Sequence, residues 1–263
     1  MSAVNKQLPL STIKKIAIAA CLTIVPALPS QAATLSLTSG LDYSTGKYGG
    51  TNSTDVTYIP VTAKYATSNW LLKLTVPYIS ITGPANTTPN IGQAVYRSNA
   101  LRTDSGLGDV ITTASYNLVD QDENGLLVDL TGKIKFGTAD KYLGLGTGAN
   151  DYAAESNIYK LYGRKTIFGS VGYKVFGQSL GYTLNNAWYG SAGFSYGISN
   201  QANAGLIYDY RNQTSSLSDP QKMWTMFYSK KISPSWKTQT YLFKGAGNTS
   251  PDYGGGLMFT RQF

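Results

Sequence analysis

Apolar and polar residues alternate along most of the chain with a period of two, which is the pattern of β-strands whose two faces meet different surroundings. Residues 126–136 show it most clearly. One face there holds Leu126, Val128, Leu130, Gly132, Ile134 and Phe136, and the other holds Asp129, Thr131, Lys133 and Lys135. The alternation recurs at 70–78, 167–175 and 188–198. This pattern predicts an all-β protein.

Twelve stretches of this kind are predicted strands. They cover residues 35–45, 54–66, 69–79, 107–119, 126–137, 152–162, 165–176, 186–198, 203–212, 222–232, 235–245 and 253–263. The connections alternate between short and long, and the long ones are rich in Gly, Asn, Ser and Thr. Barrels of bacterial outer membranes have this asymmetry, with short periplasmic turns and long extracellular loops. The predicted fold is a single antiparallel transmembrane β-barrel of about 12 strands.

The spacing of aromatic residues agrees with a membrane barrel. Trp70 and Tyr78 lie eight residues apart on one face, as do Trp188 and Tyr196. At about 3.3 Å per residue and a tilt of about 40°, this spacing covers roughly 20 Å of membrane height, close to the ~25 Å apolar band between aromatic girdles. Phe263 lies on the apolar face of the last predicted strand. A terminal Phe there resembles the signal that engages the barrel assembly machinery of Gram-negative bacteria.

The N-terminal segment has the composition of a secretory signal peptide. Three lysines precede a thirteen-residue apolar run at 16–28, and small residues lead to an expected cut after Ala32. The run is shorter than the roughly 18 to 20 residues that a membrane-spanning helix needs. Cys21 ends a stretch that resembles a lipoprotein cleavage box, but the apolar run continues beyond it. We expect cleavage of residues 1–32 and a barrel domain at 33–263, in the outer membrane.

The amino-acid composition argues against several functional classes. The net charge is +8, without a Lys/Arg run of the kind that marks a nucleic-acid surface, so we expect no nucleic-acid partner. The chain has no histidine and a single cysteine, so the usual catalytic bases and transition-metal ligands are missing. The carboxylates considered for hydrolysis fall on separate predicted strands: Asp109, Asp129, Glu155 and Asp209. We therefore expect no enzyme, no cofactor and no metal site.

Charged residues occupy the face opposite to the apolar one, and in a barrel that face lines the lumen. The predicted lumen and selectivity residues are Lys73, Asp109, Asp129, Lys133, Lys135, Lys174, Asp209 and Arg211. Such residues either fill a narrow barrel with salt bridges or line a selective pore, and their small basic excess favours anions. The 27-residue connection 80–106 carries Arg97 and Arg102. Long connections are usually functional or disordered, so we expect it to fold over or into the mouth.

An ordered series of short motifs resembles one known family. The motifs are Ser44–Gly50, Asn69-Trp70 running to Val76-Pro77-Tyr78, Ser105–Asp109, Gly144–Gly148, Gly172–Gly177 and Ser250–Asp252. Together they resemble the MetA-pathway of phenol degradation family, whose members are described as outer-membrane transporters. Lys135-Phe136-Gly137-Thr138 departs from the apolar-Pro-Thr-Gly turn of that family. The resemblance implies a transport-like barrel and, less directly, aromatic cargo.

Three functions are compatible with the sequence. The first is an outer-membrane channel that takes up small molecules, with aromatic or anionic compounds as candidate cargo and membrane lipid around the barrel. The second is a non-conducting structural or adhesion barrel that binds partners through its long loops. The third is a secreted soluble β-sandwich or lectin, because two packed sheets also produce strand alternation.

Overall fold

The computed structural model describes residues 33–84, 87–88, 92–93, 100–120, 124–179, 183–216 and 218–263. The expected signal peptide and Arg97 lie outside the described residues. The strands are β1 (Thr34–Gly46), β2 (Thr54–Ala66), β3 (Trp70–Pro84), β4 (Thr87–Thr88), β5 (Gly92–Gln93), β6 (Leu101–Leu107), β7 (Val110–Val119), β8 (Leu126–Phe136), β9 (Asp151–Tyr162), β10 (Lys165–Val175), β11 (Ala187–Ser199), β12 (Ala202–Arg211), β13 (Gln221–Lys231), β14 (Trp236–Gly245) and β15 (Tyr253–Gln262).

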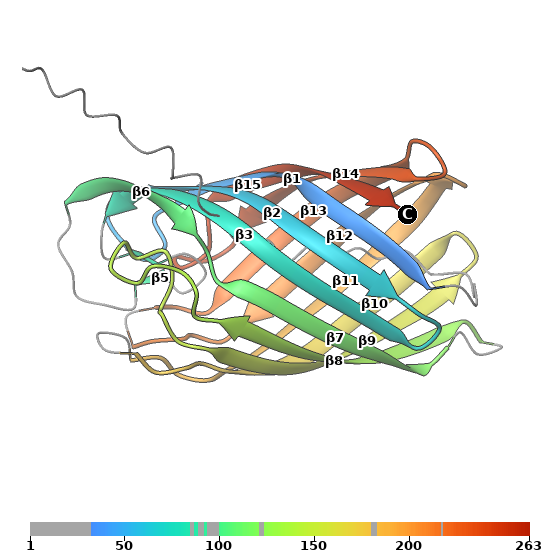
Figure 1. Cartoon of the computed structure of the whole chain (residues 1–263), viewed down its shortest axis with the longest axis horizontal. Coiled ribbons are helices and arrows are strands. Elements are labelled where there is room, and N and C mark those ends of the chain that lie inside the picture. Colours follow the sequence, from blue (N-terminus) through green and yellow to red (C-terminus); the bar gives the residue numbers. More distant parts are fainter. Residues whose placement is uncertain are drawn as a thin grey trace, which may run out of the picture.

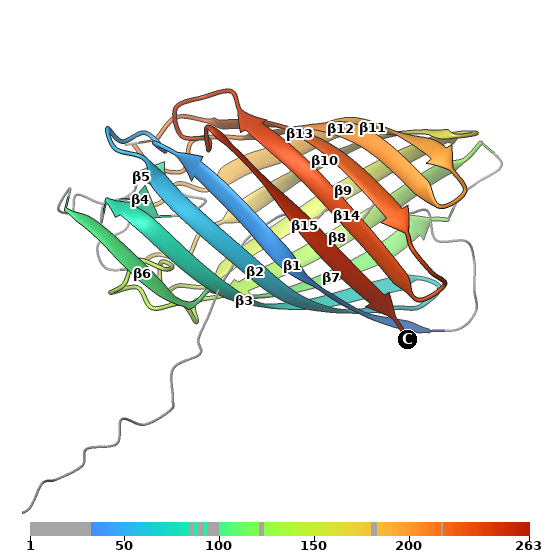
Figure 2. The ribbon, with the colours of Figure 1, turned by 90° about the horizontal axis from the view of Figure 1, so that it is seen from above.

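One sheet closes on itself. Sequential strands pair antiparallel around the wall, and β1 pairs with both β2 and β15. Figure 2 shows β15, β1, β2 and β3 side by side across this closure. The sheet has thirteen strands, but β6 and β7 share one position because each pairs with a different part of β3. The result is the predicted barrel of twelve positions, each of which pairs with a neighbour on both sides. Among the described strands, β6 pairs with β3 alone, at the end of the sheet.

The strands tilt around a common axis, and the two ends of the barrel differ (Figure 1). At one end, called here the short-turn end, the connections are 67–69, 120–125, 163–164, 200–201 and 232–235. At the other, the long-loop end, they are 47–53, 85–100, 137–150, 176–186, 212–220 and 246–252. The predicted alternation of short and long connections is therefore confirmed.

The outer face of the wall is apolar and exposed. Leu72, Val171 and Leu242 expose 43%, 56% and 63% of their surface there. Pairs of rings stand on this face at both ends, Trp70 on Tyr116 near the short turns and Tyr173 on Trp188 near the long loops. A sandwich would bury such side chains between its sheets. The single closed sheet and its exposed apolar face therefore make the soluble-sandwich hypothesis wrong.

The described residues contain no helix that is long and apolar enough to cross a bilayer.

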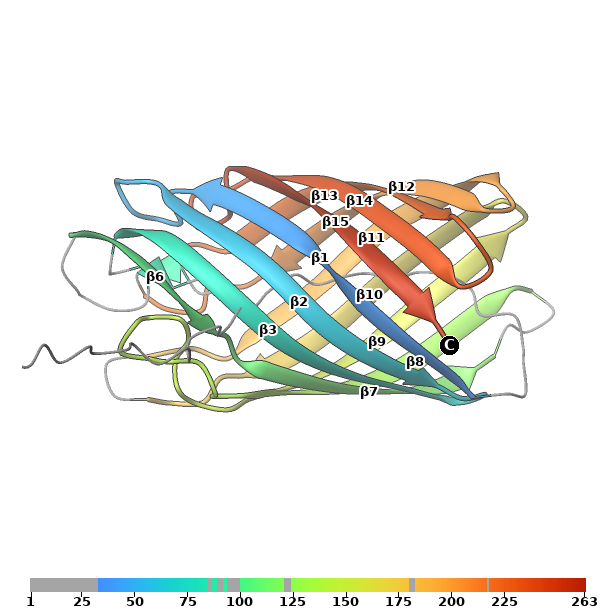
Figure 3. The ribbon, with the colours of Figure 1, turned by 45° about the horizontal axis from the view of Figure 1, so that its top comes forward.

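One part of the strand prediction is wrong. Elsewhere the predicted strand ends fall within one residue of the observed ones. Here β3 continues to Pro84, and the predicted strand 107–119 is divided between β6, which begins at Leu101, and β7, which begins at Val110. Strands β3 and β6 pair beyond the expected end, and Thr82 and Thr103 share a hydroxyl hydrogen bond of 3.0 Å. This extension rises beside the long-loop end of the wall (Figure 3). The sequence did not predict this extension, because its Ser, Thr, Gly and Pro residues give little contrast between an apolar and a polar face.

Candidate functional site

The candidate site is the lumen with its long-loop mouth. Because side chains alternate across each strand, the exposed apolar face fixes which residues turn inward. All eight predicted lumen residues lie on that inner face, namely Lys73, Asp109, Asp129, Lys133, Lys135, Lys174, Asp209 and Arg211. Their role in selectivity stays a prediction.

A network of charged groups connects strands β7 to β10 at their long-loop ends. The Lys135 Nζ lies 2.6 Å from Asp109 Oδ2 and 3.4 Å from Asp151 Oδ2, and it donates a 3.3 Å hydrogen bond to the Thr147 hydroxyl. Asp151 also binds the Lys174 Nζ at 2.9 Å. Breaking one partner of such a little-exposed network leaves an uncompensated charge. The network therefore fixes the shape of the mouth.

Lys133 forms a second ion pair deeper in the lumen. Its Nζ lies 2.6 Å from Glu155 Oε2 and 5.6 Å from the centre of the Tyr189 ring. Of the four carboxylates considered for hydrolysis, Asp109 and Glu155 are thus each held by a lysine. Asp129 lies within the electrostatic influence of Lys73.

Two further predicted residues lie on β12, and only Arg211 interacts with this network. Arg211 is the last residue of β12. The carboxylate of Asp151 interacts electrostatically with the Arg211 guanidinium. Asp209 lies two residues earlier on the same face and forms no ion pair with another described residue. The structure therefore brings Lys135, Asp109 and Lys174 together through Asp151 and leaves Asp209 on a different part of the wall.

The segment 137–150 folds into the mouth. Ala139 and Leu145 are 6% and 5% exposed, and they pack against the inward-facing Val56, Tyr58, Ile79 and Ile81 of β2 and β3. The Ala139 N–H donates a 3.0 Å hydrogen bond to Asp109 Oδ1, so the charged network also holds this loop. Figure 1 shows the segment, after β8, at the same end as β6.

The segment predicted to fold over or into the mouth is 80–106, and most of its middle, including Arg97, lies outside the described residues. Residues 80–84 and 101–106 belong to strands of the wall. Arg102 lies on β6 in an ion pair with Asp104 at 2.8 Å. A β-carbon at Gly144, whose φ is +66°, would collide with the Arg102 guanidinium. Arg102 therefore contacts the inward-folded loop from the wall.

The opposite part of the lumen wall is lined by rings. The cluster comprises Phe168, Ile207, Phe227, Tyr241 and Met258, with Tyr159 and Phe243 beside it. The rings lie close over glycines of neighbouring strands. A β-carbon at Gly205 would come within 2.6 Å of Phe227, and one at Gly256 within 2.6 Å of Tyr241. The missing side chains let these rings lie along the wall, so they line the lumen on this side. Tyr241 also donates a 2.6 Å hydrogen bond to Asp42.

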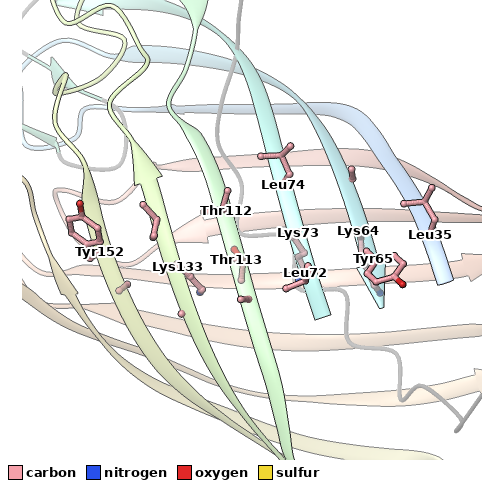
Figure 4. A pocket seen from close by; sticks show the side chains of 15 residues that line it. Leu35, Lys64, Tyr65, Leu72, Lys73, Leu74, Thr112, Thr113, Lys133 and Tyr152 are labelled. Carbon is pink, nitrogen blue, oxygen red and sulfur yellow. The ribbon is translucent and has the colours of Figure 1, made fainter. Parts of the chain in front are cut away.

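A hollow of about 630 Å³ lies over β2, β3, β7 and β8 (Figure 4). By the alternation of the strands, its large members Tyr65, Leu72, Leu74 and Tyr152 belong to the outer face, where each is at least 43% exposed. Its floor includes Gly132, which has open space where a β-carbon would be. Most of its lining therefore belongs to the outer, apolar surface, and the rest includes the lumen-facing Lys64, Lys73 and Lys133.

Sequence reasoning missed Lys64 and Asp151, and it did not pair Glu155, named among the carboxylates, with a lysine. Lys64 faces the lumen on β2, at the position opposite Lys73. Alternation along 54–66 was sufficient to find Lys64. The pairing of Lys133 with Glu155, and of Lys174 with Asp151, depends on strand register, which alternation does not supply.

The fold is that of an outer-membrane β-barrel. It is similar to an outer-membrane channel from Pseudomonas putida F1, with a TM-score of 0.69 and 14% identity over 90% of this chain and 97% of that one. Weaker likenesses are the CymD monoaromatic hydrocarbon channel (TM-score 0.46, 10% identity, 88% of each chain) and the outer-membrane channel DcaP of Acinetobacter baumannii (TM-score 0.42, 9% identity, 88% and 96%).

No protein-family model matches the sequence, and no curated protein matches it. At 14% identity the likeness to the Pseudomonas channel shows the fold. The resemblance to the phenol-degradation family is therefore supported at the level of an outer-membrane channel fold.

Proposed function

We propose that this protein is a passive channel of the bacterial outer membrane that admits small molecules and prefers anionic, including aromatic, compounds. The observation that carries the proposal is a closed barrel whose outer face is apolar while its inner face carries lysines on β2, β3, β8 and β10. In this proposal residues 1–32 direct export. The strand that ends at Phe263 engages the assembly machinery, and the long loops face outward from the cell.

The two faces suit lipid outside and water inside. In a bilayer a strand can satisfy its backbone groups only through its neighbours, and a closed barrel achieves this without an edge. The outer side chains supply the apolar band, with aromatic residues at both ends as in membrane barrels. The inner charges would be costly in contact with lipid but are solvated in a water-filled lumen.

The aromatic component of the proposal rests on the lumen as well. Lysines on one side offer charge to a carboxylate or phenolate. On the other side, the closely packed residues around Phe168, Phe227 and Tyr241, each at most 7% exposed, give the inner wall an apolar lining. The motif resemblance to the phenol-degradation family points to aromatic cargo as well.

The test is single-channel recording of the refolded mature chain in a planar bilayer. A salt gradient gives the sign of the reversal potential, and benzoate is then added on the long-loop side. We expect discrete conductance steps, an anion-selective potential and a concentration-dependent block by benzoate. Cation selectivity would refute the anion preference, and steps without block would refute the aromatic component.

A second candidate is a non-conducting barrel, and one observation favours it. The segment 137–150 packs inside the mouth, where the ion pairs of Lys135 hold it. If this loop closes the passage, a bilayer that contains correctly folded protein would remain silent. Folding is checked independently, because folded barrels of this kind migrate differently in SDS gels before and after heating.

A further inference from the structure

Four lysines occupy one hydrogen-bonded row of the barrel wall. In register, Lys64 on β2 faces Lys73 on β3, which faces Thr113 on β7, which in turn faces Lys133 on β8. The row continues through Ala153 on β9 to Lys174 on β10. Figure 4 shows Lys64, Lys73, Thr113 and Lys133 in line across their four strands. All four lysines lie on the lumen face.

The row climbs along the barrel axis. Lys64 lies two residues from the short-turn end of β2, whereas Lys174 lies one residue from the long-loop end of β10. The row crosses five strand intervals of about 4.8 Å. With strands tilted by about 40°, that path rises roughly 15 Å. The lysines therefore follow an oblique path through much of the height of the lumen.

Compensation by carboxylates is uneven along this path. Glu155 pairs with Lys133, Asp151 pairs with Lys174, and Asp129 interacts electrostatically with Lys73. The Lys64 side chain has neither a hydrogen bond nor an ion pair with any described residue. It also stands directly opposite Lys73, and like charges in that position destabilise a sheet. A bound anion between these two side chains would offset that cost.

We propose that Lys64, Lys73, Lys133 and Lys174 form a stepwise series of sites for small oxyanions, and that Lys64 and Lys73 form the strongest of them. This proposal rests on the proposed channel function and assigns its selectivity to one row of the wall. An anion would pass from one ammonium group to the next, with the Thr113 hydroxyl as a hydrogen-bond donor between Lys73 and Lys133. The chemistry recognised is that of a carboxylate or a phosphate.

The first test measures reversal potentials in a salt gradient for the wild type and the variants Lys64→Gln and Lys73→Gln. The matched control is Lys237→Gln. Lys237 faces the lumen near the short-turn end of β14, outside the row. A unit charge about 5 Å away in water changes the local ion concentration about fourfold. We expect the anion-to-cation permeability ratio to fall by about that factor for each row variant, less for the control, and to be retained in Lys64→Arg.

Equal shifts in the row variants and in Lys237→Gln would overturn the proposal, because net charge alone would then set selectivity. No shift in the row variants would also overturn it. A second measurement separates this failure from failure of the channel function. Binding of benzoate, acetate and inorganic phosphate to the detergent-folded protein is measured by calorimetric titration for the wild type and for the double variant Lys64→Gln, Lys73→Gln.

If the bilayer is silent but the double variant loses anion binding at least tenfold, the channel function fails and the lysine site stands. If the wild type and the double variant bind equally, or neither binds, the lysine site fails whatever the bilayer shows. Tighter binding of benzoate and acetate than of phosphate indicates an organic carboxylate as the natural ligand. Tighter binding of phosphate indicates an inorganic one.

Discussion

Leu145 is the main apolar anchor of the loop that folds into the mouth. It is 5% exposed and packs in the cluster formed by Val56, Tyr58, Ile79 and Ile81. Leu143 lies in the same loop but exposes 37% of its surface. The substitutions Leu145→Ala and Leu143→Ala therefore remove the same atoms from one loop, and only the first of them empties a buried position.

The expected effect follows from burial. Replacing a buried leucine by alanine costs about 2–5 kcal/mol, and a loop that can collapse onto the space falls at the low end of that range. With one order of magnitude for each ~1.4 kcal/mol, a loss of about 2–3 kcal/mol raises the population of the detached loop roughly 30- to 150-fold. The hydrogen bond from Ala139 to Asp109 remains and keeps the loop near the wall.

Trypsin cleavage after Lys141 reports on this population. Lys141 lies within the loop, and its bond becomes cleavable when the segment leaves the mouth. When opening and closing are fast relative to cleavage, the cleavage rate follows the population of the open form. We expect a cleavage rate about 30- to 150-fold above that of Leu143→Ala for the detergent-folded Leu145→Ala protein. Bilayer recordings should show a matching gain of open dwell time.

Equal cleavage rates for the two variants would refute this reasoning. They would mean that Leu145 contributes nothing to holding the loop, so that the ion pairs of Lys135 and Asp109 alone keep it in the mouth. Mass spectrometry identifies the cleaved bond, because other exposed lysines are also substrates. Both variants must first keep the heat-dependent gel migration of the folded barrel.

Two further predictions concern stability. Gly205→Ala should destabilise the barrel by about 1–3 kcal/mol, because its β-carbon would meet Phe227 and the Phe194 carbonyl, whereas Gly132→Ala should change little, since nothing lies within 4 Å of its β-carbon. Urea titration of both variants measures the difference, and equal midpoints would contradict it. Burial raises the pKa of Tyr48, outside the strands, to about 12. The Tyr48 phenol ionises at lower pH in the unfolded chain than in the folded protein. Its contribution to the free energy of unfolding is therefore complete below pH 10 and is lost as the pH rises through 12. Tyr48→Phe should therefore weaken the alkaline loss of stability, and identical slopes of stability against pH would count against it.

Much of the wall could be predicted because alternation carries the required information. A strand between lipid and water shows its two faces in its sequence, so Leu130 and Lys133 could be assigned to opposite sides. The extension formed by β3 and β6 lacks that contrast. Thr82 and Thr103 pair there across two largely polar segments, and nothing local distinguishes them from a loop.

The pairing of side chains in the lumen could not be predicted. Register depends on turn geometry and on the stagger with which the barrel closes. The contact of Lys133 with Glu155, and the position of Lys64 opposite Lys73, depend on that stagger. The inward fold of 137–150 has the same origin, because Leu145 packs on strands about sixty to ninety residues earlier in the chain.

The position of charge in the lumen should matter more than its sum. Carboxylates and lysines nearly balance there, but Asp42 and Asp209 lie on β1 and β12, apart from the lysine row. Charges are screened over about 8–10 Å at physiological salt, so an ion beside one wall responds weakly to the other. This argument predicts the outcome of an exchange that leaves the net charge unchanged.

The exchange combines Lys64→Gln with Gln239→Lys. Gln239 faces the lumen on β14, three residues from its short-turn end, as Lys64 lies near that end of β2. We expect the exchanged protein to have the reversal potential of Lys64→Gln alone. If it has the wild-type potential instead, the lumen responds to total charge, and the row of lysines is no more than the place where that charge happens to lie. The exchanged protein and the wild type have identical composition and net charge, so any difference between their reversal potentials must come from the position of the lysine.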